Sequence, residues 1–357
     1  MAEAGGGGAP RFRELDGLRG LAVLVVLAGH YVTSVEVFYP SLAPSPVPIE
    51  DGRFGVQLFF LISGYVILLT ATRSQRPSDF VIARVSRLYP AYWVALVVSL
   101  LVIALSPPGP FSYPPSEALI NVTMLQRFLL VDDIDPVYWT LAIELSFYFA
   151  MIALLIAVRG RLTDAVVRRF SLGWVALAVV VGMWFHDRPV DFVTKVALNV
   201  TNAEYAPLFC AGMMFYLSRR DGRLEPLSIV FSGGAALVAA LLHSPREGLA
   251  IAIVCLFFAA IVVRPETRWL ASGPLNQLGR ISYSMYLLHT IPGFTLIVYG
   301  TPLIGRVPAT VLAVIVVTVL ALISQRYVET DVSRAFRRWL TRTRDRLRPA
   351  VRPEAVR

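Results

Sequence analysis

Long apolar runs alternate with short arginine-bearing segments along most of the 357-residue chain. Each run is long enough, or nearly so, for a helix across a hydrocarbon core of roughly 30 Å. Because lipid offers no partners for backbone N–H and C=O groups, such runs are expected to be helical. The pattern predicts ten spans, at about residues 17–38, 54–72, 88–106, 137–158, 172–187, 205–218, 227–243, 248–263, 281–299 and 308–328.

The distribution of basic residues orients these predicted spans. Cytoplasmic loops of membrane proteins collect Lys and Arg. With the N-terminus inside, 27 of the 33 basic residues fall in cytoplasmic segments, which leaves six in outer loops. We therefore expect an all-α integral membrane protein of about ten transmembrane helices that enclose a polar cavity, with both termini in the cytoplasm.

The two ends of the chain differ in composition from the part between them. Residues 1–10 are small and glycine-rich, which predicts a disordered leader. The membrane domain is expected to cover residues 11–333, followed by a basic cytoplasmic tail at 334–357. In that tail, apolar side chains share one face among arginines, as in a helix that lies on anionic lipid. These are Phe336, Trp339 and Leu340, and disorder is expected beyond Pro349.

The loop 107–136 is the longest predicted outer segment, and prolines gather at its start. Its stretch 118–131 is apolar enough to predict a re-entrant or interfacial piece.

Composition narrows the class of protein and of partner. Hydrophobic residues make up 56 % of the chain and charged residues 16 %, a balance unlike that of soluble domains. The net charge of +9 comes from arginines between apolar runs, so no nucleic-acid partner is expected. Cys210 and Cys255 both lie in apolar segments, which predicts neither a disulfide framework nor a metal site. One lysine against 32 arginines is typical of a GC-rich bacterial genome, and a bacterial inner (plasma) membrane is the expected location.

Ionisable residues inside a span are costly to bury and are therefore functional candidates. In the first span, Arg19 and His30 are eleven residues apart, about three helical turns, so they share one helix face. A guanidinium at the cytoplasmic mouth suits an anionic donor such as a CoA thioester. A buried imidazole can remove a proton from a hydroxyl or carry an acyl group itself. The alternative is a positive-inside anchor together with a histidine bonded between helices.

Further candidates follow in later segments. Glu144 lies in mid-span, where a carboxylate is expected to act in catalysis or to pair with an arginine. Arg84 and Arg87 are one turn apart at the cytoplasmic edge. They are interpreted either as a phosphate clamp or as part of the ordinary positive-inside bias. Tyr286 and His289 are three residues apart on one helix face, where they could hold a substrate.

Several of these residues lie in stretches that resemble the acyltransferase-3 family of integral membrane O-acyltransferases. The stretch Glu14 to Ala22, followed by His30, is similar to the opening signature of that family. Later matches run in family order to about residue 330. They are the stretch Arg53 to Tyr65, then Arg84, Arg87 and Pro90, then Trp139 with Glu144, and finally Ser282 to His289.

The resemblance implies that Arg19 and His30 are the essential pair. It adds Trp139, Tyr286 and His289 as substrate-binding candidates beside Arg84 and Arg87, with Glu144 as a third catalytic candidate. Gln57 stands where the family usually has Asp, and the segment 327–331 lacks a proline that often follows its glutamate. Neither position is assigned a site. Some members carry a second, extracytoplasmic domain, and this chain is expected to be a form without one.

The expected function is transfer of an acyl group, in the first instance acetyl, from acyl-CoA to a hydroxyl of an envelope glycan or glycolipid sugar. No bound cofactor or metal is expected, and acyl-CoA, the hydroxyl acceptor and membrane lipids are the expected partners. A secondary metabolite such as a macrolide sugar is the alternative acceptor. A proton-coupled transporter that uses His30, Glu144 and His289 as a relay is the alternative outside the enzymes. The absence of an internal repeat and the arginines gathered at one mouth disfavour the transporter.

Overall fold

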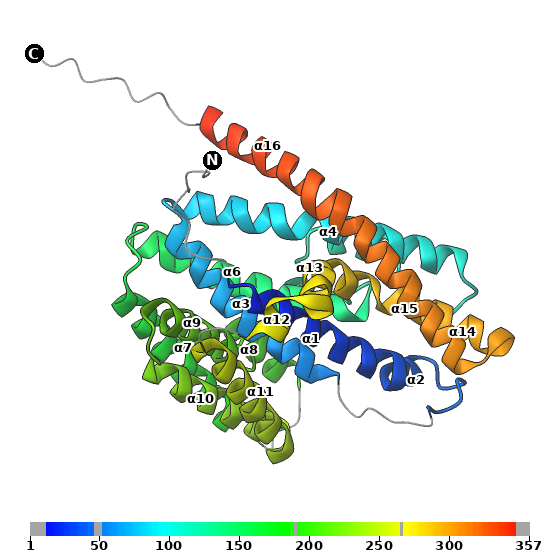
Figure 1. Ribbon diagram of the computed structural model, residues 1–357, viewed down its shortest axis with the longest axis horizontal. Helices are drawn as coiled ribbons and strands as arrows, with labels where there is room; N and C mark the ends of the chain where they lie inside the picture. The colour runs from blue at the N-terminus through cyan, green and yellow to red at the C-terminus, as the bar shows by residue number, and fades with distance from the viewer. Residues whose placement is uncertain (1–11, 46–51, 187, 189–190, 265–266, 348–357) are drawn as a thin grey trace, which may run out of the picture.

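The computed structural model describes residues 12–45, 52–186, 188, 191–264 and 267–347, and no β-strand occurs among them (Figure 1). The expectation of an all-α chain is confirmed for this part. The predicted leader 1–10 and the segment beyond Pro349 lie outside the described residues.

The first half of the bundle runs from α1 to α7. Its elements are α1 (Glu14–Gly29), the π-helical turn η1 (His30–Ser34), α2 (Val35–Phe38), α3 (Arg53–Arg73), α4 (Pro77–Leu105), α5 (Pro115–Asn121), the 3₁₀ turns η2 (Gln126–Leu129) and η3 (Pro136–Tyr138), α6 (Trp139–Ala157) and α7 (Asp164–Phe185). The stretch 118–131 is thus built from α5 and η2.

The second half runs from α8 to α16. Its elements are α8 (Phe192–Thr201), α9 (Ala206–Asp221), α10 (Pro226–Leu242), α11 (Pro245–Val263), α12 (Arg268–Ala271), α13 (Gly273–Leu288), α14 (Thr290–Ile304), α15 (Arg306–Ile323), the π-helical η4 (Ser324–Val332) and α16 (Ser333–Arg346).

All ten predicted apolar segments are helical, and seven continuous helical stretches are long and apolar enough to cross a membrane. A bent pair, α13 and α14, would make an eighth span. Helices α9 and α10 have only 16 and 17 residues. The count of ten spans therefore stays a prediction.

The predicted span 281–299 is not one continuous helix. The chain bends by 72° between α13 and α14, with His289 at the junction. Pro292 supplies the physical reason, because its ring clashes with the carbonyl four residues earlier and it has no N–H to donate. His289, which the sequence places in the middle of a span, therefore lies at a break between two helices.

The helix that contains the predicted third span begins before residue 88. Helix α4 begins at Pro77, and the carboxylate of Asp79 accepts from the main-chain N–H of Arg76, a capping arrangement that fixes the first turn. Arg84 and Arg87 therefore lie inside a regular helix. The first turns of that helix are polar, so the apolar run does not include them.

Ion pairs and polar contacts group the helix ends into two sets. In one set, Arg220 pairs with Asp164 at 2.6 Å and Arg168 with Glu225 at 2.8 Å. In the other, Arg53 pairs with Glu247 at 3.1 Å. These sets match the two sets of loops that the arginine distribution separates, which agrees with the alternation of the predicted spans. Which set faces the cytoplasm stays a prediction.

Reporter fusions test this orientation. Fusions after residue 45 and within 107–136 are expected to report the outer side, because those segments hold few basic residues. Fusions after residue 160 and at residue 357 are expected to report the cytoplasm. Alkaline phosphatase and green fluorescent protein reporters measure the two sides, and a cytoplasmic signal from 107–136 would contradict the predicted topology.

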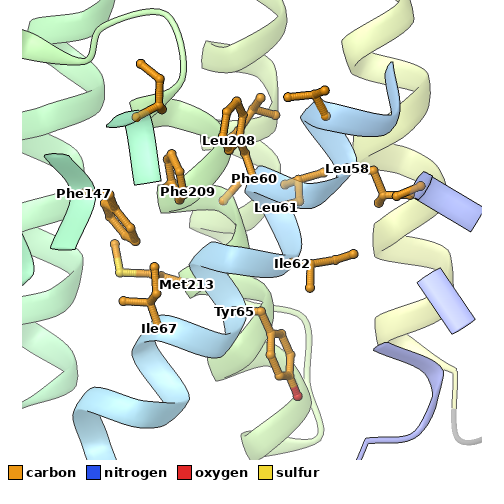
Figure 2. Packing of buried hydrophobic residues seen from close by; sticks show 14 of the residues in the cluster. Leu58, Phe60, Leu61, Ile62, Tyr65, Ile67, Phe147, Leu208, Phe209 and Met213 are labelled. Carbon is orange, nitrogen blue, oxygen red and sulfur yellow. The ribbon is translucent and has the colours of Figure 1, made fainter. Parts of the chain in front are cut away.

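Aromatic and aliphatic side chains of α3, α6 and α9 form the main core (Figure 2). Phe209 of α9 packs on Phe60 of α3 and stacks on Phe147 of α6, with ring centroids 5.0 and 4.3 Å apart. Gly64 lets α3 and α9 approach closely, because a Cβ there would lie 2.1 Å from the main-chain oxygen of Phe209. The core thus holds α3 firmly beside the polar groups described next.

Helices α1 and α13 are also in backbone contact, and this contact positions the candidate site. A Cβ on Gly279 would lie 1.6 Å from the main-chain oxygen of Asp16, and one on Gly20 would lie 2.0 Å from that of Leu275. The two helices can cross this closely only because both positions are glycine. As a result, the face of α1 that carries Arg19 and His30 lies against α13.

Candidate active site

His30 and His289 form a hydrogen-bonded pair at the centre of the candidate site. Their rings stack with centroids 4.9 Å apart, and Nδ1 of His30 lies 2.7 Å from Nε2 of His289. His30 is the first residue of the π-helical turn that follows α1, and His289 sits at the bend between α13 and α14. Both histidines therefore occupy interruptions of regular helix, a frequent setting of functional groups.

The hydrogen bonds around the pair fix which nitrogen carries a proton. Nδ1 of His289 lies 2.7 Å from the main-chain oxygen of Tyr286, which can only accept, so this Nδ1 carries hydrogen. In a neutral ring Nε2 of His289 is then an acceptor, and it receives the N–H of His30 Nδ1. In the neutral pair, Nε2 of His30 therefore keeps its lone pair. An atom of this kind can take a proton or attack a carbonyl carbon.

Hydroxyl groups and a buried carboxyl surround His289. The Tyr31 hydroxyl donates to the main-chain oxygen of His289 at 2.9 Å, and the Thr290 hydroxyl lies 3.3 Å from its Nε2. Asp135, from the loop before η3, accepts from the main-chain N–H of Val137 and of Ile291, at 3.1 and 3.3 Å. Burial raises the pKa of the Asp135 carboxyl to about 7. These contacts fasten the helix break on which His289 sits.

A small cavity of about 100 Å³ lies next to the pair, between α1, α3, α4, α6 and α13. Its polar lining includes five of the residues predicted from sequence, which are Arg19, Arg84, Arg87, Glu144 and Tyr286. His30 and His289 do not line it. Tyr286 stands between them and the cavity, because its side chain lines the cavity while its main-chain oxygen binds His289.

Glu144 bonds to hydroxyl groups rather than to an arginine. Ser63 and Tyr148 donate to its Oε1 at 2.8 and 2.6 Å. No ion pair joins Glu144 to Arg84 or Arg87 among the residues described, so the expected structural ion pair is not formed. Its second oxygen, Oε2, accepts no hydrogen bond from the described residues, and Glu144 is one of the residues that line the cavity.

The arginines of the cavity differ in their surroundings. Arg84 is 5 % exposed and donates to the main-chain oxygen of Val66 at 3.2 Å, while the rings of Phe80 and Tyr148 lie 5.6 and 5.7 Å from its guanidinium carbon. Arg19 lies 3.7 Å from Asp16 in an ion pair. Arg87 has an exposed side chain. The three guanidinium groups thus line one cavity from α1 and α4, a setting that favours anionic ligands.

Trp139 is not brought to this cavity. Its ring packs on Tyr205 and Phe60, with centroids 5.5 and 6.4 Å away, at the start of α6. Its substrate-binding role stays a prediction.

Sequence reasoning passed over three polar groups of the site, namely Ser63, Tyr148 and Asp135. Tyr148 follows Glu144 by one helical turn, a spacing that could have indicated their hydrogen bond. Asp135 lies in a loop between apolar runs, where no periodicity marks it, and Ser63 precedes Gly64 in a pair of small residues that is typical of close helix packing. Among the described residues, no group of three His, Cys, Asp or Glu side chains could hold a metal ion.

Comparison with known proteins agrees with the resemblance seen in the sequence. The profile of the acyltransferase-3 family, described as an acyltransferase domain, matches residues 12–326. The exopolysaccharide production protein ExoZ of Rhizobium meliloti is 29 % identical over 283 residues, which cover 74 % of this chain and 84 % of ExoZ.

Two further relatives are longer than this chain. The O-acetyltransferase OatA of Staphylococcus aureus is 24 % identical over 358 residues, which cover 89 % of this chain and 56 % of OatA. The peptidoglycan O-acetyltransferase OatA of Listeria monocytogenes is 25 % identical over 361 residues, with 89 % and 55 % covered. This chain therefore spans a little over half the length of the OatA proteins. No solved structure gives a significant match.

The family profile covers most of the chain, and proteins named as acetyltransferases match along most of it. This chain belongs to the acyltransferase-3 family of membrane proteins and is an acyltransferase.

Proposed function

We propose that this protein transfers an acyl group, acetyl in the simplest case, from acyl-CoA to a hydroxyl of an envelope glycan or glycolipid sugar, in a bacterial inner membrane. One observation carries the proposal: a histidine pair with a free lone pair at His30 Nε2 is joined through Tyr286 to a cavity that three arginines line. The names of two relatives, the exopolysaccharide production protein ExoZ and the peptidoglycan O-acetyltransferase OatA, support a glycan as the acceptor.

The acyl donor enters as a substrate on the side of the arginines. Arg19, Arg84 and Arg87 bind its phosphates and hold the thioester arm in the small cavity. Guanidinium groups bind phosphate oxygens through paired hydrogen bonds, which orients the donor as well as holding it. The limited volume, about 100 Å³, suits a short acyl group. Glu144, which also lines this cavity, contacts the donor arm.

The transfer step uses His30 as the base. Its Nε2 takes the hydroxyl proton of the acceptor while the hydroxyl oxygen attacks the thioester carbonyl carbon. The C–S bond then breaks, and the thiolate of CoA receives the proton from His30. In the variant of this route with an acyl-histidine, Nε2 first attacks the thioester carbonyl carbon, the C–S bond breaks, and CoA leaves as the thiolate. The acceptor oxygen then attacks the acyl carbon, the C–N bond to His30 breaks, and the hydroxyl proton of the acceptor passes to the released Nε2 and from there to the thiolate. Both routes need the same free Nε2.

His289 acts as a positioning residue in this proposal rather than as a substrate-binding one. Its Nε2 holds the N–H of His30 Nδ1, so the lone pair of His30 stays on the other nitrogen. When His30 gains a proton, the same hydrogen bond stabilises the resulting imidazolium. This role resembles that of the orienting carboxylate in a catalytic triad.

Gradient dependence separates this enzyme from a proton-coupled transporter. The purified protein in detergent is expected to consume acetyl-CoA in the presence of membrane glycans, with no ion gradient available. Release of free CoA can be followed with a thiol reagent. Turnover that appears only in sealed vesicles with an imposed proton gradient would contradict the proposal.

A further inference from the structure

A second, larger cavity opens beside the candidate active site, between the end of α3, the start of α4 and α16. Its volume is about 730 Å³, within the usual range of small-molecule binding sites. We call it the arginine vestibule, because its lining includes Arg73, Arg84, Arg87, Arg334, Arg337 and Arg344. The charged lining also includes two carboxylates, Asp79 and Glu329.

Helix α16 forms one wall of the arginine vestibule with a single face. Arg334, Arg337, Thr341 and Arg344 follow one another at spacings of three, four and three residues, which aligns them along one side of a helix. Arg344 pairs with Asp79, and Phe336 packs on Trp93 at 5.9 Å between centroids. Both contacts are with α4. They hold α16 against that helix.

Length places α16 beyond the hydrocarbon core. The helix from Arg306 to Arg346 has 41 residues. At about 1.5 Å per residue it is about 60 Å long, twice the thickness of that core. The apolar part, α15, can cross the membrane, so the arginine-bearing part projects into the water or the headgroup layer. Its vestibule face is therefore open to a soluble ligand.

The positive charge of the arginine vestibule is not neutralised by its own carboxylates. Asp79 pairs with Arg344, and Glu329 accepts from the main-chain N–H and the hydroxyl of Ser284 at 3.2 and 2.5 Å. Among the described residues, no ion pair involves the guanidinium groups of Arg73, Arg87, Arg334 or Arg337. In addition, Nε of the buried Arg84 has no hydrogen-bond partner. This arrangement suits a ligand with several negative charges.

The arginine vestibule and the small cavity have lining residues in common. Val66, Arg84 and Arg87 belong to both. A ligand can thus place a polyanionic head in the larger space and a narrow arm in the smaller one. Acyl-CoA has this shape, because its nucleotide carries a pyrophosphate and a 3′-phosphate, and the pantetheine arm ends in the thioester.

We infer that the arginine vestibule binds the nucleotide phosphates of the acyl donor, with Arg334 and Arg337 of α16 as phosphate ligands beside Arg84 and Arg87. The inference rests on the proposed function in naming acyl-CoA as the donor. It assigns α16 to donor binding. The phosphate of an anionic lipid headgroup offers the same chemistry, and the experiment below separates the two sources.

The test removes two charges from the vestibule face of α16. The double variant Arg334→Gln with Arg337→Gln keeps good helix formers at both positions. Its matched control, Arg338→Gln with Arg342→Gln, removes the same charge from exposed positions of the helix that do not line the arginine vestibule. KM and kcat are measured in neutral detergent with acetyl-CoA and with S-acetylpantetheine, which lacks the nucleotide. Calorimetry with adenosine 3′,5′-bisphosphate gives a readout that does not depend on turnover.

The vestibule variant is expected to raise KM for acetyl-CoA by about tenfold, since two charge-assisted contacts that are partly screened by water are lost, with kcat nearly unchanged. KM for S-acetylpantetheine should be unaffected, and bisphosphate binding should weaken by a similar factor. The control variant should match the parent in all three measurements.

Three results would overturn the inference. They are an equal rise in KM for both donors, an equal effect of the control variant, and competition of phosphatidylglycerol for the bisphosphate site in nanodiscs. If the parent turns over no CoA thioester but loses bisphosphate binding in the vestibule variant, the proposed function fails and the nucleotide site stands. If the parent turns over acetyl-CoA and the vestibule variant changes neither KM nor binding, the nucleotide site fails and the function stands.

Discussion

His30→Ala is expected to lower kcat by about 10² to 10⁴, the usual contribution of a general base. The free Nε2 of His30 is the atom that takes the acceptor proton in the proposed step. Acyl-CoA affinity should stay within about twofold of the parent, because His30 does not line the donor cavity. Turnover by CoA release and donor binding by calorimetry give the two numbers. His186→Ala, at the far end of α7, is the matched histidine control and should retain parental turnover.

Because the two histidines are paired, variants of His289 test the same assignment. His289→Ala should also slow turnover, because His30 then loses the acceptor that keeps its proton on Nδ1. In the His30→Ala background, however, His289→Ala should add little, since the group that it orients is already absent. A full additional loss in the double variant would show that His289 acts independently of His30. Retention of near-parental turnover by folded His30→Ala would contradict the catalytic assignment itself.

Arg19→Ala is expected to weaken acyl-CoA binding by about one to two decades. A hydrogen bond to a charged group contributes roughly 1.5 to 3 kcal/mol, and each 1.4 kcal/mol is about tenfold in affinity. Arg19→Lys should recover only part of the loss, because ammonium keeps the charge but not the paired geometry. Arg169→Ala removes an exposed arginine of α7 and serves as the control. Calorimetry with CoA measures the affinity of each variant. Parental affinity in Arg19→Ala would contradict the assignment of Arg19 to the donor site.

Much of the architecture could be predicted because membrane solvation leaves a strong pattern. All ten apolar segments are helical. Arg19 lines a cavity with residues of α13, and His30 contacts His289, which directly follows that helix. Helical phase alone accounts for this, since eleven residues make about three turns. The cost of burying charge likewise indicated Glu144, and the one-turn spacing of Arg84 and Arg87 indicated a pair on one helix face. The structure brings all three residues to one cavity.

Contacts between distant segments could not be predicted in the same way. The partner of His30 is 259 residues away, and no periodicity states which helices are neighbours. The bend at His289 had a local signal in Pro292, three residues later, but the apolar run continues through it. For the tail, the apolar residues Phe336 and Trp339 predicted a helix that lies on lipid. The arginines on the other side of α16 line a cavity only because that helix packs against α4, a contact that the sequence does not indicate.

Acetyl transfer to a glycan through His30 can be followed by labelling. The purified protein is incubated with acetyl-CoA labelled in the acetyl group and with total membrane lipids and glycans, and the fractions are separated and counted. We expect label in an ester of a glycan or glycolipid fraction for the parent and at most background label for His30→Ala at equal donor occupancy. Label confined to a small-molecule fraction would contradict the glycan acceptor, and equal label with both proteins would contradict acyl transfer through His30.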